Sequence, residues 1–200
     1  MRGLVLSVLV SVLWTSTPVA HDDPEAKPYK SADAYQIYGL LLPQEESYGF
    51  AKGTLIIREE TVSNPEVPMP GLMPPPSPPC VTPEAGSQFK DAIADYNRLN
   101  NKTWLLQREF QLDKPYEIVS SNTIDALFKE GSWEGFYKRY PDSGGYIIMS
   151  AVGFNKEKTR AMVYMGSSCG LRCGRWGLHL FEKVHSKWKE VPGVTCNMMS

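Results

Sequence analysis

The sequence lacks an excess of charge of either sign. Its 21 Lys and Arg residues against 22 Asp and Glu residues leave a formal net charge of −1 over 200 residues. Non-specific nucleic-acid binding depends on clustered Lys and Arg side chains, so the sequence predicts no nucleic-acid partner. The His-Glu-x-x-His zinc motif and the phosphate-binding loop are also absent from the sequence. These absences exclude the best-known zinc-protease and nucleotide-binding sites.

Long hydrophobic runs are missing except at the start of the chain. Met1-Arg2 is followed by an apolar run from Gly3 to Trp14 and then by small residues up to Ala20. This order of basic start, apolar stretch and small-residue tail is typical of a secretory signal peptide. A membrane anchor is the alternative, but the run is about half of the ~20 apolar residues that a span needs. We therefore expect cleavage after Ala20 or nearer Ala26, and a secreted or periplasmic protein without a membrane span.

The composition of the whole chain is that of a globular protein. Hydrophobic residues make up 42% of the chain and charged residues 22%, which supplies enough apolar material for a core. At roughly 100–200 residues per domain, the length predicts one domain. We expect a signal peptide at residues 1–20, a flexible leader at 21–32 and a single domain at 33–200.

Prolines are concentrated in one segment of the expected domain. Nine prolines occur between Pro65 and Pro83, and each of them removes a backbone donor and fixes φ. No helix or central strand tolerates that density, so residues 63–83 are predicted to be a proline-rich loop inserted across the surface of the domain. A docking site for a proline-binding partner is the alternative interpretation.

Hydrophobic periodicity predicts three helices and a series of strands. The helices are expected at residues 33–42, 84–99 and 123–140, the last interrupted at Gly131, and the strands at 54–62, 104–112, 116–119, 145–152, 160–165, 176–184 and 187–191. In the first helix, Asp33 is the expected cap, and the residues at 34, 37, 38 and 41 share one buried face.

The order of these elements predicts an α+β fold. Short connections at residues 155–159 and at His185-Ser186 favour sequential antiparallel pairing of the last strands. We expect an antiparallel sheet that ends in a C-terminal meander, with the helices packed on one face. Both faces of the strand Ala161–Met165 are apolar, which predicts a central strand covered on each side.

Four cysteines follow the signal segment, at positions 80, 169, 173 and 196. An even number in an exported protein favours disulfides, with three possible pairings. Cys169 and Cys173 are expected to be bonded to each other, because they are close in sequence and Gly170 and Gly174 permit a tight turn. The pairing of Cys80 and Cys196 stays open. A redox pair is the alternative for Cys169 and Cys173, but redox motifs have a two-residue spacer at a helix start.

One loop carries the candidate binding residues. The connection from Gly166 to Gly177 combines Arg172, Arg175 and Trp176 with the expected disulfide, and we predict that it points the two arginines outward. His179 is expected to be a partly buried packing residue in a strand rather than a general base. No metal ligand set, cofactor site or catalytic residue is predicted.

Several segments of the C-terminal half carry a family resemblance. They are Phe136–Tyr146, Ser150–Asn155, Ala161–Tyr164, the Cys-Gly-x-x-Cys-Gly run at 169–174 and the Lys-rich hairpin with a Trp at 182–188. Together with residues 38–42, they resemble a family of uncharacterised exported bacterial proteins with this C-terminal Cys-Gly-x-x-Cys-Gly loop. The resemblance implies export from a bacterial cell and carries no known activity.

The sequence therefore predicts an exported, non-enzymatic module that binds a ligand or a component of the cell envelope. The alternative is a secreted hydrolase whose carboxylates or His179 converge only in the folded protein. Two titratable groups within hydrogen-bond reach in a shared cleft would favour the hydrolase.

Overall fold

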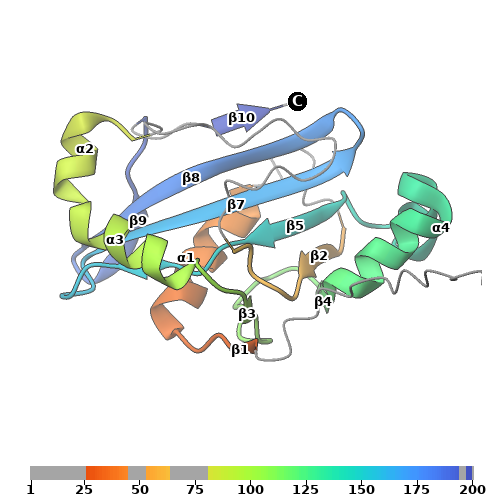
Figure 1. Ribbon diagram of the computed structural model, residues 1–200, viewed down its shortest axis with the longest axis horizontal. Coiled ribbons are helices and arrows are strands. Elements are labelled where there is room, and N and C mark those ends of the chain that lie inside the picture. Colours follow the sequence, from red (N-terminus) through yellow and green to blue (C-terminus); the bar gives the residue numbers. More distant parts are fainter. Residues whose placement is uncertain (1–25, 45–52, 64–80, 194–196, 200) are drawn as a thin grey trace, which may run out of the picture.

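The computed structural model describes residues 26–44, 53–63, 81–193 and 197–199 (Figure 1). The helices are α1 (Ala32–Leu41), α2 (Pro83–Gln88), α3 (Lys90–Leu99) and α4 (Ser121–Arg139). The strands are β1 (Lys27–Pro28), β2 (Leu55–Arg58), β3 (Trp104–Leu105), β4 (Tyr116–Val119), β5 (Tyr146–Met149), β6 (Gly153–Phe154), β7 (Arg160–Gly170), β8 (Cys173–Val184), β9 (Lys187–Glu190) and β10 (Asn197–Met199). The main sheet has the order β10-β8-β7-β5-β2-β4, with β6 paired to β7 and β9 paired to β8, while β1 and β3 form a separate parallel pair.

The predicted α+β class and the C-terminal meander are confirmed. Strands β7, β8 and β9 pair sequentially and antiparallel. The sheet as a whole is mixed, however, because β2 runs parallel to both of its neighbours, β4 and β5. The physical reason is α4, which links β4 to β5 as a crossover and so brings β5 back in the same direction on the other side of β2.

Helices cover both faces of the sheet, so the predicted packing on one face is wrong. Alternate residues of β7 point to opposite faces. Val163 lies in the core cluster of α1, whereas Met162 lies in the cluster of α2 and α3 with Leu180 of β8. Helix α4 packs on the same side as α2 and α3, over Ile56 of β2. The prediction that residues 161–165 form a central strand covered on each side is thereby confirmed.

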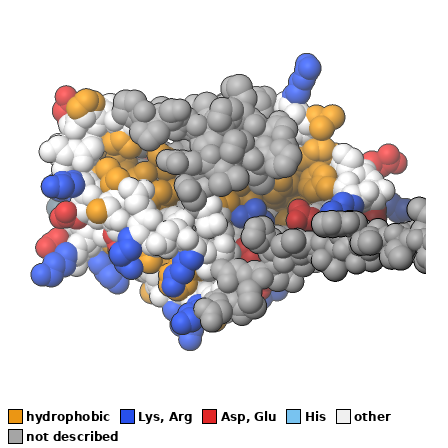
Figure 2. Space-filling model, viewed as in Figure 1, with side chains coloured by type: hydrophobic (Ala, Val, Ile, Leu, Met, Phe, Trp, Pro, Cys, Tyr) orange, Lys and Arg blue, Asp and Glu red, His pale blue; other side chains and the backbone are white. Residues whose placement is uncertain are grey.

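The figures show the same layers. Helices α3 and α4 lie at opposite ends of the near face of the sheet in Figure 1. On that face, hydrophobic side chains gather in two areas in Figure 2, one at the side of α2 and α3 and one at the side of α4. Helix α1 supplies the core of the other face.

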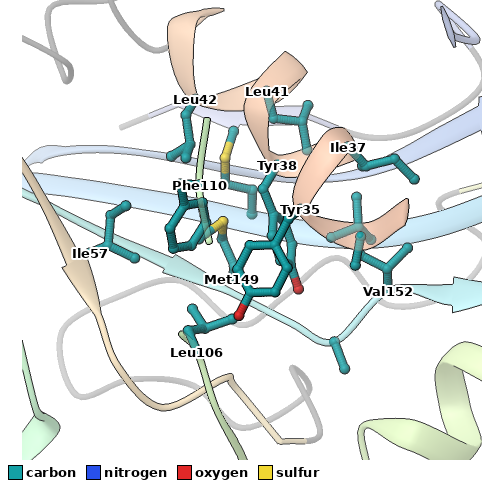
Figure 3. Packing of buried hydrophobic residues seen from close by; sticks show 14 of the residues in the cluster. Tyr35, Ile37, Tyr38, Leu41, Leu42, Ile57, Leu106, Phe110, Met149 and Val152 are labelled. Atoms are coloured by element: carbon teal, nitrogen blue, oxygen red, sulfur yellow. The ribbon is translucent and has the colours of Figure 1, made fainter. Parts of the chain in front are cut away.

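Aromatic residues fill the core between α1 and the sheet (Figure 3). The ring of Phe110 meets those of Tyr35 and Tyr38 edge-on or tilted, with centroids 5.0 and 5.8 Å apart. Ile57 of β2 and Met149 of β5 lie beneath them and are fully buried. The predicted buried face of α1 is confirmed, because residues 34, 37, 38 and 41 are all buried.

A bend at Ser150–Val152 separates β5 from β6, and buried polar side chains satisfy its backbone. Asn100 Oδ1 accepts from the Ala151 amide at 2.8 Å, and Asn100 Nδ2 donates to the Ala151 carbonyl at 3.0 Å. Tyr38 Oη donates to the carbonyl of the first bend residue at 2.7 Å, and Tyr29 Oη accepts from the amide of the last at 2.9 Å. Buried backbone groups need such partners, so these side chains fix the bend.

Several element boundaries differ from the sequence expectations. Ser31 caps α1 in place of Asp33, because its side chain accepts from the Ala34 amide. The predicted helix at 84–99 is two helices that break at Phe89, and the strand predicted at 104–112 is reduced to β3. The interruption in α4 lies at Ser132, with φ 55° and ψ −142°, rather than at Gly131.

Some predictions fall outside the described residues. These are the signal peptide at 1–20 with the leader up to residue 25, most of the proline-rich segment at 63–83, and the cysteines at 80 and 196. At the described end of the proline-rich segment, Pro83 is the first residue of α2 and Thr82 caps that helix. None of the helices that the structure describes is both long and apolar enough to cross a membrane.

Candidate functional site

The β7–β8 hairpin ends in a cross-linked tip. Cys169 and Cys173, which the sequence predicted to pair, are joined by a disulfide, with Cα atoms 5.1 Å apart. Between them only Leu171 and Arg172 form the turn, and both are exposed. The strand register shifts by one residue at Cys169, a bulge that reshapes the hairpin just before its end. We call residues 169–173 the hairpin tip.

Two contacts from outside the hairpin fix the base of this tip. Tyr137 Oη of α4 donates to the Cys169 carbonyl at 2.9 Å. Gly145, which has φ 116°, lies so close to the Ser168 carbonyl oxygen that a Cβ at this position would overlap it. Only glycine fits both the backbone conformation and the space at this position. The tip is therefore held by the disulfide and by the segment that precedes β5.

The predicted binding loop at 166–177 is wrong in its extent. Strands β7 and β8 continue up to the turn, so Arg175 and Trp176 lie within β8 and are only 8% and 5% exposed. Their backbone also pairs with β10 on the outer side of β8. Of the three candidate binding residues, Arg172 alone is exposed, because hairpin pairing leaves just two residues in the turn.

The buried His179 and the half-buried Glu190 form a hydrogen-bonded pair on the α1 face of the sheet. His179 Nδ1 lies 2.6 Å from Glu190 Oε1, and the two side chains are 2% and 27% exposed. Gln44, just after α1, donates to the other carboxylate oxygen at 3.1 Å. Burial acts to raise the pKa of Glu190, but the hydrogen bonds from His179 and Gln44 outweigh it and hold that pKa below its ordinary value. A carboxylate only accepts, so Nδ1 of His179 carries the proton.

A second polar cluster attaches the start of α1 to the β8–β9 hairpin. Asp33 accepts from Lys183 Nζ at 2.8 Å and from Trp188 Nε1 at 3.2 Å. The hydrogen bond from Lys183 is the main reason that the pKa of Asp33 lies below its ordinary value. Asp33 was predicted to cap the helix, but its carboxylate instead reaches the β8–β9 hairpin. Helix α1 is thus joined to that hairpin by polar contacts at both ends.

A groove runs along the outer side of α1. Its volume is about 720 Å³, within the roughly 300–1,000 Å³ range of ligand sites in proteins. The helix supplies the floor, and the segment at 109–111 and the β8–β9 turn supply the walls. The residues that line the groove are Ala32, Tyr35, Gln36, Gly39, Leu40, Glu109, Gln111, Ser186, Lys187 and Trp188. We call this feature the α1 groove.

The chemistry of the α1 groove is mixed. Leu40 is 43% exposed and provides an apolar contact. The side chains of Gln36, Gln111 and Lys187 form no hydrogen bond or ion pair in the part of the chain that the structure describes. The aromatic residues of the groove have their polar atoms engaged within the protein, since Tyr35 Oη accepts from the Gln107 amide at 2.6 Å. The groove therefore offers uncommitted amides and charges beside one exposed leucine.

A Gly-x-Ser-x-Gly run at residues 166–170, which the sequence reasoning missed, bears on the hydrolase alternative. In esterases the serine of this motif lies on a tight turn between a strand and a helix. Here β7 continues through the run into a hairpin, and Ser168 is only 8% exposed. Ser168 and His179 also point to opposite faces of the sheet, because His179 pairs with Val163, five residues before Ser168. The two side chains are therefore not positioned to act together.

The sequence reasoning identified His179 but missed Glu190. The β8–β9 register, in which Phe181 lies opposite Glu190, is the signal that brings the two side chains to the same face. Among the described residues, no group of three or more His, Cys, Asp or Glu side chains is arranged to hold a metal ion.

No protein-family model matches the chain, and no curated sequence or solved structure matches it either. The resemblance to exported bacterial proteins with a Cys-Gly-x-x-Cys-Gly loop therefore stays a prediction from the motifs.

Proposed function

We propose that the protein is an exported binding module and that the α1 groove is its binding site. The observation that carries the proposal is the groove itself, in which the side chains of Gln36, Gln111 and Lys187, beside the exposed Leu40, form no hydrogen bond or ion pair with any residue that the structure describes. A ligand site typically combines an apolar surface with a few polar groups that fix orientation. The occupant is a ligand or a component of the cell envelope.

The attachment of α1 supports this role. The Asp33 contacts at its start and the Gln44–Glu190 contact after its end hold the helix against the β8–β9 hairpin. The floor and one wall of the groove are therefore fixed relative to each other before any ligand arrives. A preformed site loses less conformational freedom on binding than one that has to be ordered.

A groove-filling variant tests the proposal. A Cβ at Gly39 makes only ordinary contact, 3.6 Å from the Gln111 carbonyl oxygen, so Gly39→Trp is expected to fold with its indole in the groove. Gly86→Trp, at a helical glycine with open space around it, is the matched control. The probe is a set of soluble fragments that includes a disaccharide, a tripeptide and N-acetyl-leucine amide. Two-dimensional NMR of the ¹⁵N-labelled protein records which amide signals the fragments shift.

We expect fragments to shift the side-chain amide signals of Gln36 and Gln111, and Gly39→Trp to abolish these shifts while Gly86→Trp leaves them unchanged. Shifts that persist in Gly39→Trp, or that cluster away from the α1 groove, contradict the proposal. Circular dichroism of both variants establishes that they are folded.

The hydrolase alternative has one observation in its favour, the 2.6 Å contact between His179 and Glu190. Two other observations weigh against it. The His179 side chain is 2% exposed, and neither residue of the pair lines the α1 groove. A hydrolase also needs a nucleophile or an activated water within reach of the base, and Ser168 points to the other face. Binding is therefore the function that the geometry supports better.

A further inference from the structure

Two large hydrophobic side chains are exposed in the described ranges of the chain, Leu40 at 43% and Leu171 at 86%. Leu40 lines the α1 groove, whereas Leu171 lies in the turn of the hairpin tip. Single exposed leucines are common on protein surfaces. Here one exposed leucine lies in a groove and the other at the tip of a hairpin, and the described ranges expose no other large hydrophobic side chain.

The charges of the tip and the groove are complementary. Arg172 directly follows Leu171 in the tip, and Glu109 lines the wall of the α1 groove. An arginine paired with a carboxylate forms strong charge-assisted hydrogen bonds in a planar geometry. Lys187, on the β8–β9 side of the groove, repels a guanidinium. An incoming Leu-Arg turn therefore has a preferred orientation, with its arginine towards Glu109.

The hairpin tip is also preorganised for insertion. The disulfide, the hydrogen bond from Tyr137 to Cys169 and the close approach of Gly145 fix its backbone. A short disulfide loop contributes little to global stability. Its main effect is on the shape of the turn, and rigid elements lose less entropy when they bind.

A contact between the tip and the groove of the same molecule is excluded by distance. The tip lies at the start of β8, and the β8–β9 turn that borders the groove lies at its end. Strand β8 has 12 residues, which at about 3.3 Å per residue place its ends roughly 36–40 Å apart. A tip therefore reaches only the groove of another molecule.

We propose that the hairpin tip of one copy of this chain inserts into the α1 groove of a second copy, with Leu171 against Leu40 and Arg172 paired with Glu109. The contact is heterologous, since each copy uses a tip on one side and a groove on the other, and it therefore propagates head to tail. The inference rests on the proposed function, because it names the occupant of the α1 groove as a second copy of the chain.

Sedimentation velocity of the purified, oxidised protein over a range of concentrations tests the inference. We expect the average mass to rise with concentration beyond that of a dimer. Leu171→Ser and Leu40→Ser should each weaken association at least about tenfold, since burying a leucine contributes about 1.5–3 kcal/mol and each 1.4 kcal/mol is a factor of ten. Asn101→Ser, at an exposed position after α3, is the control and should associate like the wild type.

A mixture of the two leucine variants gives the sharpest result. Leu171→Ser retains an intact groove and Leu40→Ser retains an intact tip, so the mixture should form a one-to-one complex that cannot grow. Glu109→Arg and Arg172→Glu should each weaken association, and the double variant should recover it, because every copy then carries the reversed pair. These outcomes distinguish a specific head-to-tail contact from non-specific association.

The inference is overturned if the wild type stays monomeric up to about 1 mM, where even a weak interface of about 4 kcal/mol associates. It is also overturned if Leu171→Ser associates like the wild type, or if the mixed variants form either no complex or long assemblies. The proposed function is judged separately, by the fragment shifts and the Gly39→Trp variant. A monomeric protein whose groove binds fragments refutes the self-association and leaves the binding site in place.

Discussion

Asn100 is the residue whose removal gives the clearest test of how this fold is stabilised. Its side chain is 2% exposed and satisfies both backbone groups of Ala151, at the bend between β5 and β6. In Asn100→Ala the amide of Ala151 loses its partner, while the carbonyl of Ala151 retains the hydroxyl of Ser150 at 3.0 Å. The carbonyl of Tyr96, the third partner of Asn100, still accepts from the backbone amide of residue 100.

The expected loss of unfolding free energy follows from these changes in hydrogen bonding. One buried amide without a partner costs about 1–3 kcal/mol, and the two weakened carbonyls add about 0.5–1 kcal/mol each. We therefore expect Asn100→Ala to lower the free energy of unfolding by about 3 kcal/mol. For a domain of this size each kcal/mol lowers the melting temperature by about 2–4 °C, so the melting temperature should fall by about 6–12 °C.

Urea unfolding followed by tryptophan fluorescence measures the effect, with Asn101→Ala as the matched control. Asn101 is the next residue in the chain, is exposed, and makes no side-chain hydrogen bond in the described part of the structure. It should lose less than about 0.5 kcal/mol, as surface substitutions do. If Asn100→Ala is destabilised no more than Asn101→Ala, the reasoning that this side chain fixes the bend is refuted.

Three further predictions concern the helix kink, the hairpin tip and the attachment of α1. Ser132→Gly should raise the free energy of unfolding by about 1 kcal/mol, because φ 55° with ψ −142° is strained for any residue except glycine; an unchanged or lower melting temperature contradicts this. Replacing Cys169 and Cys173 by Ser should cost about 2 kcal/mol and leave the domain folded, and peptide mapping of the non-reduced protein should show the two linked to each other and not to a third cysteine. The pKa of Asp33 in the folded protein lies below its unfolded value because of Lys183, so this contribution is complete above the unfolded pKa and is lost as pH falls through the folded one. The difference in unfolding free energy between the wild type and Asp33→Asn should therefore shrink as pH falls, and a difference that stays constant from pH 7 to pH 2 argues against the contact with Lys183.

Both proposals use the α1 groove, and the self-association proposal also uses the hairpin tip, which the binding proposal does not need. The α1 groove depends on α1, the segment at 109–111 and the β8–β9 turn, whereas the hairpin tip depends on the disulfide and on Tyr137. A variant of the tip therefore tests the partner without changing the groove.

Local sequence pattern was sufficient to predict the elements that a short stretch of chain specifies. The apolar residues at 34, 37, 38 and 41 repeat at helical spacing, and all four are buried against the sheet. The meander follows from short connections, such as the turn at His185-Ser186, whose two residues have φ 48° and 63°. The apolar faces of residues 161–165 predicted a central strand, because alternation along a strand is itself local information.

Tertiary structure decided everything that depends on which distant segments pair. The sheet became mixed because α4 carries the chain around β2, a choice among pairings that no single strand encodes. His179 meets Glu190, and Arg175 is buried rather than exposed, because strand register sets the face and the end of each strand. The α1 groove is lined by three segments that are far apart in the sequence. Helix and turn signals act over a few residues, whereas these contacts are fixed only when the whole sheet and its packed helices form together.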